Sequence, residues 1–115
     1  MDIVVLDPPE GNVVGREMQF GEVEGKFLLQ DNGSVVYRSP HDEKMWLAGP
    51  SVEAFRGAAA SWRRYNEDVT AANTEEAQLA VAARLRRELE HLGVLTDPDN
   101  SVWAFFAEQA QDGQL

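Results

Sequence analysis

The sequence predicts an α+β fold in which an antiparallel sheet from the N-terminal half packs against about three C-terminal helices. Two observations support this prediction. The first half of the chain holds short apolar segments separated by glycine, proline and turn residues, whereas a helical period of about 3.6 residues begins after Ser51. No linker, repeat or low-complexity tract interrupts residues 1–115, so we expect a single domain.

The N-terminal half predicts a short strand over residues 3–6 and then a loop over residues 7–11, where two consecutive prolines oppose strand continuation. The apolar segments 13–14 and 18–20 are too short, between glycines, for an assignment. The clearest signal is a hairpin over residues 27–38, because β-branched and aromatic residues flank an Asn-Gly pair there.

The Asn32-Gly33 pair tolerates positive φ at both central turn positions, so we expect a tight type I′ turn. A strand over residues 45–48 would follow the hairpin and complete a meander. A Gly-Pro pair then ends this strand, and Ser51 is placed to cap a helix by accepting a hydrogen bond from one of its free amides.

Three helices are predicted in the C-terminal half. The apolar stripe of the first comprises Val52, Phe55, Ala59, Trp62 and Tyr65. After a weaker link over residues 66–73, Thr74 caps a second helix that ends at Gly93. The stripe of this second helix comprises Ala82, Leu85, Leu89 and Leu92. The third helix is expected to start at Asp97-Pro98, with aspartate as the cap, and to end near Gly113.

The composition narrows the class of partner and the compartment. The net charge of −10 argues against nucleic acid or an anionic membrane as a direct ligand and favours a basic protein partner. The chain has no cysteine, which excludes disulfides and thiol chemistry and fits a reducing compartment. No apolar run approaches the roughly 20 residues that span a bilayer, and the N-terminus does not resemble a signal peptide. We therefore expect a cytoplasmic protein.

Two stretches contain metal-ligand residue types without the required pattern. Glu88 and His91 have the Glu-x-x-His spacing of carboxylate di-metal sites, but the chain has no second helical histidine to complete one. A calcium-loop pattern that starts at Asp97 fails at its sixth position, where Val102 replaces the required glycine. The sequence therefore predicts no metal site and no cofactor.

A catalytic triad is equally unsupported. Ser51, His41 and Asp42 have the residue types of a triad, but no Gly-x-Ser-x-Gly elbow surrounds the serine, and helix capping explains it better. We predict no catalytic residue and a protein that is not an enzyme. A small enzyme or metal protein that uses His41, or Glu88 with His91, is the less favoured alternative.

Acidic side chains without an intervening lysine or arginine dominate the chain from Glu88 onward. They form either an ordinary solvated surface or a patch that steers a basic partner. The residues predicted for such a patch are Asp97, Asp99, Glu108 and Asp112. The tryptophans Trp46, Trp62 and Trp103 are either partner anchors or core residues, and their periodicity favours the core.

Three stretches in a fixed order resemble the SUKH superfamily of bacterial immunity proteins, and its fourth subfamily in particular. The hairpin over residues 27–37 is similar to the family's strand, Asp/Gly turn and Val-Tyr strand. Residues 46–55 resemble its strand-to-helix segment with Ser-x-x-x-Phe, and residues 101–115 resemble its tryptophan helix and Asp-Gly-x-Leu tail. The segment before the hairpin is shorter than in the family.

The resemblance implies an α+β fold and a role without catalysis: the chain would bind and neutralise a polymorphic toxin, often a nuclease or a nucleic-acid deaminase, inside the producing bacterial cell. It implies no catalytic residues. A regulatory or assembly module of the same fold, either monomeric or a homodimer, is the alternative from another functional class.

Overall fold

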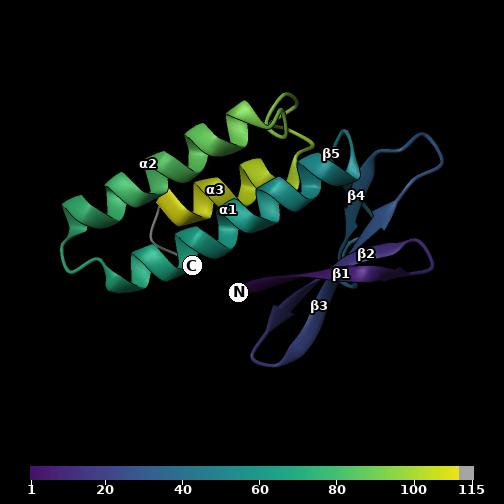
Figure 1. Cartoon of the computed structure of the whole chain (residues 1–115), viewed down its shortest axis with the longest axis horizontal. Coiled ribbons are helices and arrows are strands. Elements are labelled where there is room, and N and C mark those ends of the chain that lie inside the picture. The colour runs from purple at the N-terminus through teal and green to yellow at the C-terminus, as the bar shows by residue number, and fades with distance from the viewer. Residues whose placement is uncertain (112–115) are drawn as a thin grey trace.

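The computed structural model describes the backbone of residues 1–111 and the side chains of residues 1–110. It confirms the predicted α+β fold, with the sheet first in the chain and the helices after it (Figure 1). The antiparallel sheet has the strand order β1-β2-β3-β4-β5. Its strands are β1 (Asp2–Glu10), β2 (Val13–Gln19), β3 (Glu22–Leu29), β4 (Val35–Arg38) and β5 (Met45–Gly49). The helices are α1 (Val52–Ala71), α2 (Glu75–His91) and α3 (Val102–Gln111).

Strand β1 continues through the segment for which the sequence predicts a loop over residues 7–11. It lies at the edge of the sheet and pairs only with β2. The pairing is irregular between Val5 and Glu10, so Pro8 and Pro9 interrupt no regular ladder there. The sequence prediction was wrong because an edge position tolerates prolines that a central strand would not.

The β2–β3 hairpin has a type I′ turn, whereas the sequence predicts such a turn at Asn32-Gly33, between β3 and β4. Strand pairing extends to Gln19 and Glu22, which leaves Phe20 and Gly21 as the two central residues. Their φ angles are 52° and 81°, and type I′ geometry needs positive φ at both positions. Residues 13–14 and 18–19, unassigned from the sequence, belong to strand β2 of this hairpin, and Phe20 belongs to its turn.

The β3–β4 hairpin has a wider loop than the predicted tight turn. The Gly33 amide donates to the Gln30 carbonyl at 3.0 Å, and the Gln30 amide donates to the Ser34 carbonyl at 2.8 Å. Of the loop residues only Gly33 has a positive φ, 89°, as in a three-residue loop that ends in a left-handed residue. The side chain of Asn32 accepts the Ser34 amide at 3.0 Å, which stabilises this loop in place of a type I′ turn.

The helix caps confirm the predicted starts of α1 and α2. The Ser51 hydroxyl oxygen accepts the Ala54 amide at 3.1 Å, and the Thr74 hydroxyl oxygen accepts the Ala77 amide at 3.0 Å. The predicted stripe of α1 is buried from Phe55 to Tyr65. Helix α1 then continues to Ala71, through most of the segment predicted as a weak link.

The start of α3 differs from the sequence prediction. The segment around Asp97 and Pro98 is a turn, in which the Asp97 carbonyl accepts the Asn100 amide at 3.1 Å. The helix begins four residues later, at Val102, and the Ser101 hydroxyl oxygen accepts the Ala104 amide at 3.2 Å. Ser101 therefore provides the cap that the sequence assigns to Asp97. The predicted end near Gly113 lies outside the described residues.

The core lies between one face of the sheet and the helices. Helix α1 contacts β1 and β5, α3 contacts β5, and α2 packs against both of these helices (Figure 1). The aromatic residues of the core are Phe27, Tyr37, Phe55, Trp62, Tyr65, Trp103 and Phe106. The Trp103 indole donates to the Ala48 carbonyl at 2.7 Å, which attaches α3 to β5. The predicted core role of Trp62 and Trp103 is confirmed, whereas Trp46 is only partly buried.

The connection before α3 extends the sheet beyond β5. Leu47 and Ser101 form an isolated parallel bridge, and the Leu47 amide donates to the Asn100 carbonyl at 2.7 Å. This contact brings the 97–100 turn next to β5. None of the helices within residues 1–111 is long and apolar enough to cross a bilayer.

Candidate protein-binding surface

One end of the sheet gathers the most exposed aromatic residues. The antiparallel pairing places the β2–β3 turn and the 39–44 loop, which connects β4 to β5, at the same end. The other two hairpin turns lie at the opposite end (Figure 1). We call the first of these the aromatic end, because Phe20, Trp46 and Phe105 lie there or beside it.

Trp46 of β5 and Phe105 of α3 form the centre of this surface. Their ring centroids are 6.1 Å apart with tilted planes, which is a favourable aromatic geometry. Phe105 is 46% exposed, although the rest of the α3 aromatic stripe is buried. Large aromatic side chains that are half exposed in this way are typical anchors of protein–protein interfaces.

Lys44 holds the 39–44 loop against this pair. Its Nζ lies 3.9 Å from the centroid of the Trp46 ring and donates to the Asp99 carbonyl at 3.1 Å. The two contacts connect the loop, β5 and the 97–100 turn. Trp46 therefore has a fixed position before any partner arrives, which lowers the entropy cost of binding.

The structure brings together two of the acidic residues predicted from the sequence. Asp99 and Glu108, both exposed, line one hollow of about 370 Å³ together with Trp46, Phe105 and the basic Arg86. Asp97 is also exposed, but its carboxylate accepts the Asn100 side-chain amide at 2.9 Å and does not line this hollow. Asp112 lies outside the described residues.

A second hollow, of about 280 Å³, lies on the inner side of the same aromatic pair. Its polar wall includes Glu17 and Asp42, and Tyr37, Trp46 and Phe105 are among its aromatic walls. Glu17 is only 5% exposed, yet it belongs to β2 of a sheet face that otherwise packs apolar and aromatic side chains. A carboxylate buried at this depth is costly unless its hydrogen bonds are satisfied.

Tyr37 supplies one of those hydrogen bonds. Its hydroxyl donates to Glu17 Oε1, and the Gln19 side-chain amide donates to Oε2 at 3.2 Å. Burial of the Tyr37 phenol, together with its hydrogen bond to Glu17, raises its pKa well above the ordinary value. Tyr37 therefore stays protonated and keeps its role as donor to the carboxylate throughout the physiological pH range.

Phe20 is the most exposed large apolar side chain among those described, at 102% of its reference area. It also has a left-handed backbone, which is unfavourable for a bulky residue. Folding explains neither feature, because the ring packs on nothing and asparagine or glycine would suit the turn better. Strain of this kind is found most often at functional sites.

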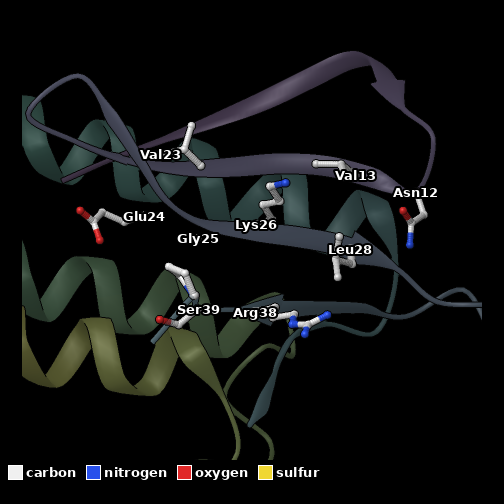
Figure 2. Close-up of a pocket in the computed structure, with 10 residues that line it drawn as sticks. Asn12, Val13, Val23, Glu24, Gly25, Lys26, Leu28, Arg38 and Ser39 are labelled. Carbon is white, nitrogen blue, oxygen red and sulfur yellow. The ribbon is translucent and has the colours of Figure 1, made fainter. Parts of the chain in front are cut away.

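The face of the sheet that the helices leave uncovered has a different character. It holds a hollow of about 500 Å³ lined by apolar residues beside Lys26 and Arg38 (Figure 2). Arg16 pairs with Lys26, and Lys26 pairs with Arg38, so three basic side chains form a row across β2, β3 and β4. Glu10 forms an ion pair with Arg16, which partly neutralises the row.

The side chains that the sequence offers as catalytic residues or metal ligands interact with other groups of the fold. Ser51 caps α1, and Glu88 forms ion pairs with Arg64 at 3.0 Å and with Arg84 at 3.8 Å. His41 lies 3.5 Å from a carboxylate oxygen of Glu24 on the protein surface. Within the described part of the chain, no three histidine or acidic side chains come together as a possible metal site.

Sequence reasoning missed Glu17, Phe20 and Phe105 as surface-forming residues. The Phe-Gly pair at 20–21 lacks the asparagine or aspartate that usually signals a type I′ turn. Phe105 falls within an apolar helical stripe, where periodicity assigns it to the core. Glu17 lies in a stretch interrupted by glycines, so the sequence has no clear period there from which its burial could be predicted.

Comparisons with protein-family models, curated proteins and solved structures found no match for this chain. Its relation to the SUKH superfamily therefore stays a prediction from the residues quoted above.

Proposed function

We propose that this chain is an immunity-type binding protein that neutralises a cognate bacterial polymorphic toxin by forming a complex with it. The toxin would be a basic nuclease or deaminase domain. The observation that carries the proposal is the Trp46–Phe105 pair, which is held in place, half exposed at Phe105, and bordered by Asp99 and Glu108. An aromatic centre bordered by two carboxylates suits a basic protein surface, and Arg86, which also lines the hollow, is ion-paired with Glu90.

The charge of the whole chain supports the same class of partner. A net charge of −10 attracts a basic domain over a distance and speeds its association, whereas it repels nucleic acid itself. Bound over the substrate groove of a nucleic-acid-processing toxin, the acidic surface would compete with the phosphates of the substrate. Neutralisation would then need no catalysis by this chain, and the location would be the cytoplasm of the producing cell.

Co-expression tests this proposal. Each candidate toxin domain found in a neighbouring gene is expressed in a sensitive host with and without the chain, and the two proteins are then purified together. We expect restored growth and a stable complex. If the chain binds no neighbouring toxin and restores no growth, the proposal is wrong.

The second candidate is a non-toxin interaction module, and the uncovered sheet face favours it. Met45 and Leu47 are 48% and 40% exposed on β5, and Leu47 lies opposite Val36 in the register. An apolar row of this kind could join two copies of the chain. Sedimentation equilibrium of the wild type and of Leu47→Lys distinguishes the candidates, because a dimer that this substitution dissociates would favour the module.

A further inference from the structure

The hollow on the inner side of Trp46 contains a buried negative charge without a counter-charge. Within residues 1–111, no lysine, arginine or histidine side chain and no amino terminus lies within 4.0 Å of the Glu17 carboxylate. Its two hydrogen bonds come from neutral groups, the Tyr37 hydroxyl and the Gln19 amide. The carboxylate of Glu17 is therefore hydrogen-bonded without an ion pair, and Met1, with the amino terminus, is the one residue with a positive group among those that line the hollow.

The walls of this hollow suit a cationic group rather than an anion or an apolar group. Trp46 and Phe105 line it with aromatic rings, whose faces attract a guanidinium or ammonium ion, and Asp42 contributes a second carboxylate. The volume of about 280 Å³ is many times the roughly 30 Å³ that one water occupies in the liquid, so a side-chain head group fits. Lys44 Nζ already lies 3.9 Å from the centroid of the Trp46 ring, so this ring holds one cation and an incoming cation would use its opposite face.

We infer that this hollow is a binding site for a basic side chain, with Glu17 as its counter-ion and Trp46 as its stacking surface. The identity of the partner rests on the proposed function. In the complex, the toxin would insert an arginine or a lysine side chain into this hollow. Arginine fits best, since its planar guanidinium can stack on the indole while it donates to Glu17.

Glu17→Gln is the matched test variant because it keeps the shape and one oxygen that accepts from Tyr37. It removes the charge and replaces the second acceptor oxygen with an NH2 group, so the Gln19 amide must rotate to keep its hydrogen bond. In a complex, loss of one partner of a buried charge pair weakens binding about 30-fold or more. The same change relieves the free protein of a buried carboxylate, so its thermal midpoint should stay the same or rise. A structural role alone would lower the midpoint and leave binding of cations unchanged.

The test needs no partner protein. N-acetylarginine amide is titrated into the full ¹⁵N-labelled chain, and the indole Nε1–H resonances are followed by NMR, with N-acetylcitrulline amide as the neutral isostere. We expect a saturable shift of the Trp46 indole with the arginine compound. The citrulline compound should give no such shift with the wild type, and the arginine compound should give none with Glu17→Gln. The control Glu90→Gln, on an exposed part of α2, should respond to the arginine compound as the wild type does.

Equal responses to arginine and citrulline, equal responses of the wild type and Glu17→Gln, or no response of the wild type would each overturn the inference. The outcome is independent of the toxin experiment. A saturable arginine response that depends on Glu17 supports the cation site even if no toxin binds, and in that case only the immunity function fails.

Discussion

The hydroxyl of Tyr37 on β4 reaches across β3 to donate a hydrogen bond to the carboxylate of Glu17 on β2. Gly25 of β3 makes this possible because the tyrosine ring lies directly over it. A Cβ atom at position 25 would come within 2.4 Å of Tyr37 Cε2. The buried charge at the aromatic end therefore depends on a glycine in the middle strand.

Gly25→Ala should displace the Tyr37 ring and break its bond to Glu17. We expect a loss of about 2–4 kcal/mol in the free energy of unfolding, from overpacking and an unsatisfied carboxylate oxygen. Urea denaturation measures this change. In a Tyr37→Ala background the added methyl has room, so the cost of Gly25→Ala should fall markedly. If Gly25→Ala costs the same free energy of unfolding with and without the Tyr37 ring, the ring does not pack over Gly25 as described.

Tyr37→Phe should cost about 1–3 kcal/mol of stability at neutral pH, because Glu17 loses its hydroxyl donor. It should also change the alkaline limb of the stability curve. The folded-state pKa of Tyr37 lies above the unfolded value of about 10, so the phenol contributes stability that is fully present below pH 10 and is lost as pH rises beyond it. Tyr37→Phe should make this decline shallower.

Tyr65→Phe is the matched control for that experiment. Burial alone raises the Tyr65 pKa, and no hydrogen bond connects its hydroxyl to a carboxylate within the described residues. Removal of the Tyr65 hydroxyl should also make the decline of stability at alkaline pH shallower, with little loss of stability at pH 7. A loss at pH 7 as large as that of Tyr37→Phe would show that the bond to Glu17 contributes nothing.

Phe20→Asn should stabilise the fold, since asparagine adopts positive φ more readily and the exposed ring packs on nothing. The expected gain is about 0.5–1 kcal/mol, measured by thermal or urea unfolding. Phe20→Ala keeps the strain and removes the ring, so its stability should stay close to the wild type. If Phe20 is a partner anchor, both variants should weaken binding of the partner equally. A loss of stability in Phe20→Asn would show that the backbone of Phe20 is not strained.

Charge reversal at Asp99 and Glu108 should slow association with a basic partner. Asp99→Lys/Glu108→Lys should lower the association rate constant about tenfold at low ionic strength and reduce its salt dependence. The control pair Asp31→Lys/Glu67→Lys changes the net charge equally, with Asp31 in the β3–β4 turn at the opposite end of the sheet. If the association rate constants measured by stopped flow fall equally for both double variants, only the total charge of the chain controls association, and the prediction is wrong.

The sequence predicts the layout of the fold better than its turns. Helix periodicity and the caps Ser51 and Thr74 locate α1 and α2, because these signals act within a few residues. The strand through Pro8, the turn at Phe20 and the late start of α3 depend on neighbours distant in the chain. Local propensity cannot report an edge position or the bridge of Leu47 to Ser101.

The candidate surface was predictable only in part. Its acidic composition is visible in the sequence, and Asp99 and Glu108 do lie together. The aromatic centre is not visible, since Trp46 and Phe105 have the spacing of core residues and only the end of the sheet leaves them exposed. Glu17 lies in a strand that was too interrupted by glycine to assign.

Growth rescue by matched variants tests the central claim most directly. The chain is co-expressed with each candidate toxin domain found in a neighbouring gene, as the wild type, as Phe105→Ala and as the control Leu79→Ala. The control removes another exposed apolar side chain, on α2. We predict that the wild type and Leu79→Ala restore growth and that Phe105→Ala, folded by circular dichroism, does not. Full rescue by Phe105→Ala, or no rescue by the wild type, would contradict the account.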